Sequence, residues 1–174
     1  MQLRPLRLTD RIDVAKLYHS VSGMVKGISR SPEEITETWI FSLFNKLPHN
    51  LVGIVAFVED EYGDEEIIGL AHAEKSGLIC YDHILANFTV IVHPDYQNTG
   101  VGKKLGYEFL KFVATNRPDV KRLEMESRKD LMHHQTYMQA GFVKEGEVKE
   151  RIRNLDGSFS DSILLVWINP NFKP

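Results

Sequence analysis

A short polar turn with two glycines, residues 97–103, contains the residue types that most directly predict chemistry. An apolar, β-branched run at 88–92 precedes it, and an amphipathic helix follows, with Val101, Leu105 and Phe109 at helical spacing. The first N–H groups of a helix lack partners within it, and the peptide dipoles favour an anion there. Gly100 and Gly102 would let a phosphate approach the backbone. The stretch therefore predicts an anion-binding helix N-terminus.

Two familiar phosphate motifs do not fit this turn. A Walker A loop would need glycine at Gln97 and serine or threonine at Lys104. The dinucleotide-binding fingerprint would need its third glycine at Leu105, and Gly106 comes one residue late.

The turn does resemble the acyl-CoA pyrophosphate loop of the Gcn5-related N-acetyltransferases, Gln/Arg-x-x-Gly-x-Gly/Ala. The preceding Val92-His-Pro94 is similar to that family's strand end. The resemblance implies acetyl-CoA as co-substrate, no metal, and backbone amides of the strand that align the acetyl carbonyl. The cofactor-binding residues it implies are Val90, Val92, Gln97, Asn98, Thr99, Gly100, Val101, Gly102 and Lys103. The alternative is an ordinary strand-turn-helix corner with incidental glycines.

A second segment, Tyr137 to Phe142, resembles the family's Leu-Tyr-x-x-x-Gly-Phe pattern, with Thr136 in place of the leucine. In that family the tyrosine often protonates the departing CoA thiolate. Packing of Tyr137 on Phe142 is the structural alternative, and the two roles are compatible. Asp130 stands where the family commonly has an asparagine that binds the pantetheine arm, but a carboxylate accepts hydrogen bonds without donating them.

The general base is left open by the sequence. Some family members carry a glutamate that corresponds roughly to Ala86 or Asn87. His83 is a candidate because imidazole titrates near neutrality, although a surface histidine is the ordinary interpretation. His72 and Glu74, on the preceding predicted strand, are further candidates.

Bulk properties predict one cytoplasmic domain spanning residues 1–174. The net charge of −3 provides no basic field for nucleic acid, and no apolar run is long enough for a membrane span or signal peptide. A single cysteine, Cys80, excludes an internal disulfide and is expected to be a buried or half-buried apolar residue. His133 and His134 are adjacent and so lie on different helix faces, which argues against a metal pair.

The predicted element order is strand, two helices, three strands, helix, strand, helix, two strands. The first strand covers residues 2–8, with Pro5 indicating a sheet edge. Thr9 or Asp10 is expected to cap the first helix, Ser31 the second helix, which ends at Pro48, and Asp130 the last helix. This order matches the fold of the same family, α/β (mixed α+β), in which helices flank a central, mixed, mostly antiparallel sheet.

The resulting hypothesis is an acetyl-CoA-dependent N-acetyltransferase that acts directly on a primary amine of a small molecule or of a peptide N-terminus. The competing hypothesis is a catalytically silent acyl-CoA-binding module. Residues 19–31 and the hairpin 151–160 are expected to build the acceptor site. The acidic stretch 59–66 is expected to be a solvated hairpin turn, the alternative being a rim that attracts polyamines. The partners expected are the amine acceptor and, as a possibility, a second copy of the chain in a homodimer.

Overall fold

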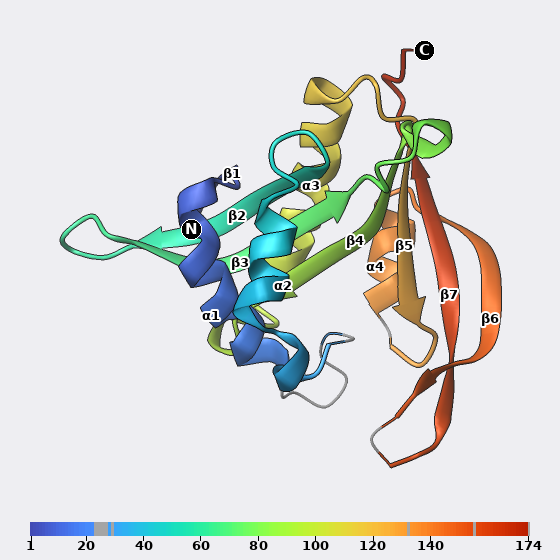
Figure 1. Cartoon of the computed structure of the whole chain (residues 1–174), viewed down its shortest axis with the longest axis horizontal. Helices are drawn as coiled ribbons and strands as arrows, with labels where there is room; N and C mark the ends of the chain where they lie inside the picture. Colours follow the sequence, from blue (N-terminus) through green and yellow to red (C-terminus); the bar gives the residue numbers. More distant parts are fainter. Residues whose placement is uncertain (23–27, 29, 132, 155, 174) are drawn as a thin grey trace. The chain divides into compact units, whose positions relative to one another are not determined.

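The computed structural model describes the chain except for residues 23–27, 29, 132, 155 and 174. It contains two compact units, residues 1–74 with 89–110, and residues 75–88 with 111–174. Strand β4 (Ile84–Val92) and helix α3 (Val101–Asn116) each continue from one unit into the other (Figure 1).

In the first unit, three antiparallel strands form one end of the sheet: β1 (Gln2–Pro5), β2 (Leu51–Glu59) and β3 (Glu65–Glu74). Strand β1 is the edge strand, as Pro5 predicts, but it ends at Pro5 rather than at Leu8. Leu8 instead opens a 3₁₀ turn, Leu8–Asp10. The acidic residues between β2 and β3 form the predicted hairpin turn, where Asp60 N donates to Asp64 O at 3.1 Å.

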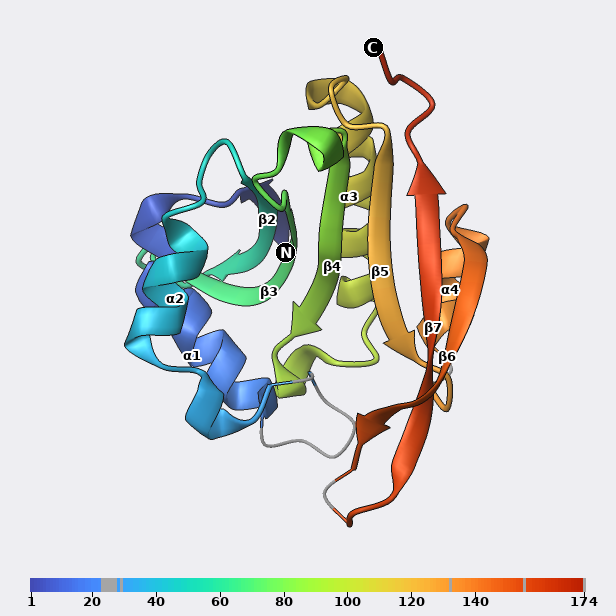
Figure 2. The same cartoon turned by 45° about the vertical axis from the view of Figure 1, so that its right-hand side comes forward.

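Helices α1 (Arg11–Ser22) and α2 (Glu37–Phe44) cover one face of this part of the sheet (Figures 1 and 2). Their apolar residues share a core with β2 and β3 that includes Val14, Leu17, Ile40, Val55 and Leu70. The other face of β3 meets α3, because a Cβ at Gly69 would lie 2.6 Å from Leu105 and 3.4 Å from Val101. Gly69 therefore lets α3 approach the strand closely.

Two predicted helix starts are wrong in detail. Ser31 and Glu34 do form a capping box, but it opens only a 3₁₀ turn, Pro32–Glu34. Helix α2 begins later, where Thr36 Oγ1 accepts the N–H of Trp39 at 3.1 Å, and it ends at Phe44, before Pro48. Asp10 does not cap α1: its carboxylate accepts the N–H of Arg7 at 2.7 Å and pairs with Arg4.

In the second unit, the start of β4 pairs in parallel with β5 (Arg122–Arg128), and β5 pairs antiparallel with β7 (Phe159–Ile168). Strand β6 (Val143–Arg153) then forms the expected hairpin with β7, turning at Gly157 with φ +85°. Helix α4 (His133–Gln139) precedes this hairpin.

The part of the chain that is described thus has seven strands, mainly antiparallel, and four α-helices, in the predicted order. The predicted mixed α/β fold is confirmed. Cys80 is a correction, because it is exposed, in a 3₁₀ turn at Ile79–Tyr81. None of the described helices is both long enough and apolar enough to cross a membrane.

Candidate functional site

The predicted cofactor-binding turn lies in the first unit, between β4 and α3. His93 N donates to Ile68 O at 2.9 Å and so fixes the end of β4 on β3. Gln97 Nε2 donates to Val92 O at 3.0 Å, and Thr99 Oγ1 donates to Tyr96 O at 2.6 Å. The side chains of this turn therefore hold its backbone in shape.

Both glycines occupy positions that suit a close anion. Gly100 has φ +90°, which other residues adopt only with strain, and its carbonyl accepts the N–H of Lys104 at 3.0 Å. No atom lies within 4 Å of the point where a Cβ at Gly100 would stand. A Cβ at Gly102 would lie 3.4 Å from Val92. Because α3 starts at Val101, the N–H groups of its first turn have no acceptor within the helix.

The remaining residues of the turn are open to solvent. Asn98, exposed with φ +62°, has a left-handed conformation that asparagine tolerates well. Thr99 is exposed as well. Lys103 is exposed, and its ammonium lies 5.9 Å from the centre of the Tyr107 ring. A lysine in the first turn of a helix opposes the dipole, which a bound polyanion would offset.

Tyr137 lies in the second unit, near the end of α4. The helix ends as predicted, because Gly141 has φ +99° and Phe142 N donates to Tyr137 O at 3.0 Å. The Tyr137 ring packs edge-on against Phe142 at 5.7 Å and against Phe88 at 6.0 Å. Burial raises the pKa of Tyr137 to about 12, so its phenol stays protonated at neutral pH and can donate a hydrogen bond.

His83 and Asn87 also lie in the second unit, along the start of β4. Asn87 is exposed and has φ +56° within the strand, directly before Phe88, which contacts Tyr137. Strand β4 pairs with β5 at Ile84 and Leu85, just before this left-handed residue. His83 is half-buried, and its carbonyl accepts the N–H of Lys121 at 2.8 Å. The structure thus places Asn87 next in the chain to a residue that contacts Tyr137, and His83 four residues before Asn87.

Asp130 has a different setting from the one predicted. Helix α4 begins at His133, so Asp130 is not its cap. Its carboxylate pairs with Arg128 at 3.1 Å, and the same guanidinium donates to Asn154 at 2.7 Å and to Ser160 at 3.1 Å. Asp130 therefore belongs to a network that ties β5 to the β6–β7 hairpin.

The sequence reasoning missed a buried polar pair in the first unit. The Tyr18 hydroxyl lies 2.5 Å from His72 Nε2, and the two residues are 3% and 4% exposed. Burial lowers the pKa of His72 to about 4, and no described group bonds its Nδ1. Helical spacing marks Tyr18 as a core residue, but no local pattern indicates that its hydroxyl meets a strand histidine. Glu74, the other base candidate on β3, pairs with Lys46.

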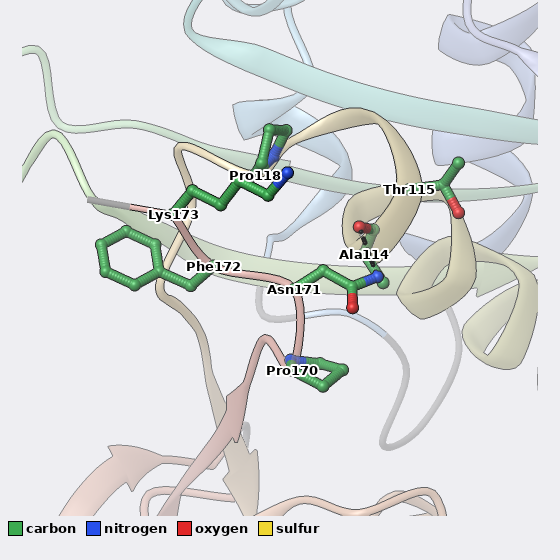
Figure 3. A pocket seen from close by; sticks show the side chains of 7 residues that line it. All are labelled: Ala114, Thr115, Pro118, Pro170, Asn171, Phe172 and Lys173. Carbon is green, nitrogen blue, oxygen red and sulfur yellow. Dashed lines mark hydrogen bonds between the residues drawn. The ribbon is translucent and has the colours of Figure 1, made fainter.

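A hollow in the second unit contains none of the predicted site residues (Figure 3). It is lined by the end of α3 and by the C-terminal tail, where Asn171 Nδ2 donates to Ala114 O at 3.0 Å and Lys173 N donates to Pro118 O at 2.9 Å. Through these two hydrogen bonds the C-terminal tail is attached to α3 and to the segment that follows it. Among the described side chains, no three of His, Cys, Asp or Glu gather in a way that could hold a metal ion.

Parts of the predicted acceptor region lie outside the described residues, namely 23–27, 29 and 155. The described parts of the region are His19–Ser22, Ile28, Arg30, Ser31 and the hairpin on either side of residue 155.

Comparison with solved structures shows the fold shared with several acetyltransferases. A phosphinothricin acetyltransferase from Sinorhizobium meliloti, in complex with acetyl-CoA, has a TM-score of 0.80 at 16% identity, over 99% of this chain and 90% of that one. A ribosomal-protein-alanine N-acetyltransferase from Brucella melitensis has a TM-score of 0.77 at 18% identity, over 97% and 99%. A chimera of the spermidine N-acetyltransferase from Vibrio cholerae has a TM-score of 0.72 at 21% identity, over 97% and 95%.

At these identities the likeness concerns the fold, and the acceptors named for the three proteins differ in kind. A comparison with curated protein sequences finds no match. The model of the acetyltransferase (GNAT) family matches residues 18–142, which is more than half of the chain and includes the glycine turn and the segment from Tyr137 to Phe142. The chain therefore belongs to the GNAT acetyltransferase family.

Proposed function

We propose that this chain is an N-acetyltransferase that moves an acetyl group from acetyl-CoA directly to a primary amine. The observation that carries the proposal is the turn before α3. A helix of 16 residues begins there with two glycines, one at φ +90° and one close to Val92, and with free first-turn amides. This arrangement suits a pyrophosphate, because neither glycine has a side chain to keep the anion away from the backbone amides.

Each part of the turn has a role in this proposal. The amides of Val101, Gly102 and Lys103 would bind phosphate oxygens, and the Lys103 ammonium would add charge. Gln97, bonded to Val92 O, and Asn98 and Thr99 would keep the loop open. The amides of Val90 and Val92 would align and polarise the acetyl carbonyl. Acetyl-CoA supplies the acetyl group activated as a thioester.

The reaction needs no covalent bond to the protein. The amine nitrogen forms a bond to the acetyl carbon while the bond from that carbon to sulfur breaks. The sulfur leaves with the bonding electrons and takes up one proton, and the nitrogen gives up one. Because the Tyr137 phenol stays protonated, it can donate to the leaving sulfur.

His83 is the proposed proton acceptor for the amine, directly or through water, and Asn87 is a polar neighbour of the reacting groups. His72 is a poor base, because an imidazole with a pKa of about 4 binds a proton weakly at neutral pH. Asp130 is a poor partner for the pantetheine arm, because its carboxylate already pairs with Arg128.

The test is turnover on a broad panel of primary amines, followed by the release of free thiol from acetyl-CoA and by mass spectrometry of the product. Acetylated amine and free thiol in equal amounts are expected. Binding of acetyl-CoA without acetylation of any amine would instead support the silent acyl-CoA-binding module.

A further inference from the structure

An arginine that forms no ion pair with any described residue stands beside the buried Tyr18–His72 pair in the first unit. Four residues form what we call the aromatic cluster: Tyr18 on α1, Arg30, Trp39 on α2 and His72 on β3. Tyr18 and Trp39 pack edge-on, with ring centres 4.9 Å apart. The Arg30 guanidinium lies 4.3 Å above the Trp39 ring.

The charge of Arg30 is available for a ligand. Within the described residues Arg30 forms no ion pair, and its guanidinium stacks on the face of Trp39. A stacked guanidinium keeps the N–H groups on its edge free, and they match the two oxygens of a carboxylate or phosphonate. Lys46 and Glu74, which influence His72, pair with each other. Arg30 therefore gives the aromatic cluster a net positive charge.

A second observation in the aromatic cluster is a buried polar atom without a partner. His72 Nδ1 is buried and has no partner among the described groups. Buried polar atoms almost always have a partner, and a missing one indicates a water, an ion or a ligand. The other ring nitrogen is already engaged by Tyr18, so Nδ1 is the one ring atom of His72 that still has hydrogen-bonding capacity for a water or ligand in the cluster.

The aromatic cluster lies beside the strand that is proposed to align the acetyl group. His93 N bonds Ile68 O, and the carbonyl of Ile91 lies 3.2 Å from the Cβ position of Gly69, so β4 runs antiparallel to β3. His72 is three residues further along β3 than Gly69, so it lies near the part of β4 that contains Thr89 and Val90. Ile91 belongs to the same core as Tyr18, so alternate residues of β4 face the aromatic cluster.

We infer that Arg30, stacked on Trp39, binds an anionic group of the acceptor, so that the acceptor is a small amine that also carries a carboxylate or a phosphonate. The inference rests on the proposed N-acetyltransferase function and makes Arg30 a specificity-determining residue. A polyamine would be repelled at this place. The acidic turn between β2 and β3 does not offset that repulsion, because it lies about six residues, roughly 20 Å, along β3 from His72.

The experiment compares acceptors that differ in the anionic group, namely the L-amino acids, their amides and aminoalkylphosphonates of matching length, and it adds spermidine as a polyamine without an anionic group. At least a roughly tenfold higher kcat/KM is expected for acid-bearing amines, as is typical when a charge-assisted hydrogen bond is lost. The carboxylate and phosphonate series show which anion is preferred. Equal or higher kcat/KM for the amides or for spermidine would overturn the inference.

Variants of Arg30 identify the residue responsible. Arg30→Gln should raise KM for acid-bearing amines about tenfold or more while kcat changes little, since a contact shared by ground and transition states is removed. The KM of Arg30→Lys for acid-bearing amines should lie between those of the parent and Arg30→Gln. Lysine keeps the positive charge but lacks the paired N–H donors of the guanidinium. The control is Arg11→Gln, which removes another arginine over an aromatic ring, 5.7 Å from Phe41. Parent-like selectivity in Arg30→Gln contradicts the inference.

Calorimetric titration of the L-amino acids into the CoA-saturated protein separates this inference from the proposed function. Binding that Arg30→Gln weakens about tenfold supports the anion site even if no amine is acetylated, a result that would overturn only the N-acetyltransferase proposal. Absence of binding, or binding that Arg30→Gln leaves unchanged, overturns the anion site even if other amines are acetylated.

Discussion

The Tyr137 hydroxyl allows a test of catalysis that leaves packing intact. Tyr137→Phe keeps the ring and its contacts with Phe88 and Phe142 and removes only the donor. Loss of a general acid should lower kcat by about 10²-fold or more, with acetyl-CoA affinity nearly unchanged. Tyr62→Phe, at an exposed tyrosine of the β2–β3 turn, is the control in steady-state assays. A Tyr137→Phe enzyme with parental kcat would leave Tyr137 as a packing residue.

The buried His72 makes folding stability depend on pH. Its pKa is about 4 in the folded protein and 6.5 in the unfolded chain, so between these values the unfolded chain binds more protons. Stability is therefore fully present above pH 6.5 and declines as the pH falls towards 4, by up to about 3 kcal/mol. The pKa values of Asp119 and Glu147 are lowered from 3.8 and 4.5, so their contributions are lost from about pH 4.5 downwards, at the acid end of this window and beyond it.

Urea unfolding at pH 7.0, 6.0 and 5.0 measures this dependence. His72→Gln should flatten it, whereas His49→Gln, at an exposed histidine, should not. The same slope in parent and His72→Gln would mean that folding does not lower the pKa of His72.

At the scale of elements, the order and nearly all the strands followed from hydrophobic patterning, whereas helix ends did not. The Ser31 capping box predicted one continuous helix because Ser, Pro and Glu occur at the right spacing. Ile35, with ψ +68°, instead interrupts the helical conformation, and Thr36 caps a new helix, α2. That break serves the packing of Ile35 and Ile40 in one core. Cys80 was misplaced for a related reason, because residue type predicts burial only on average.

The site was predictable where a local pattern defines it and not where it depends on distant residues. The glycine turn and the end of α4 are each continuous in sequence, and their conformations follow from Gly100 and Gly141. Tyr18 and His72 are 54 residues apart, and only the packing of α1 on β3 brings them together.

The cap of α2 can be tested by a matched pair of substitutions. Thr36→Ala removes the acceptor for Trp39 N–H and should lower the free energy of unfolding by about 1 kcal/mol. Thr38→Ala, exposed within the same helix, should be neutral or slightly stabilising, because alanine favours helix. Denaturant unfolding measures both. Equal effects would argue against Thr36 as the cap.

The start of α3 can be tested at Gly102, because a substitution at Gly100 would strain the backbone at φ +90° whatever the ligand. Gly102→Val puts a side chain beside Val92, within ordinary contact distance, where the pyrophosphate is proposed to lie. Folding should change little and acetyl-CoA affinity should fall by about tenfold or more, in line with the loss of one charge-assisted contact. Thr115→Val, exposed on the last turn of α3, is the control for calorimetric titration. Unchanged affinity in a folded Gly102→Val variant would place the anion elsewhere.

For the whole molecule, acetyl-CoA should raise the melting temperature, because a ligand that binds only the folded chain stabilises it by mass action. At a hundred times its Kd the gain is about 2.7 kcal/mol, which for a chain of this length corresponds to about 5–10 °C.

Pantetheine, which lacks the pyrophosphate, should give a much smaller shift at equal concentration if the turn before α3 binds the phosphates. The acetyl-CoA shift should also be reduced in Gly102→Val. It should be retained in Tyr137→Phe and Arg30→Gln, because these residues are proposed to act on the leaving sulfur and on the acceptor and not to bind the pyrophosphate. Calorimetric scans at several ligand concentrations measure all five cases. An equal shift from pantetheine and acetyl-CoA would mean that the glycine turn does not hold the cofactor, and no shift from either at millimolar concentration would remove the basis for acetyl transfer by this chain.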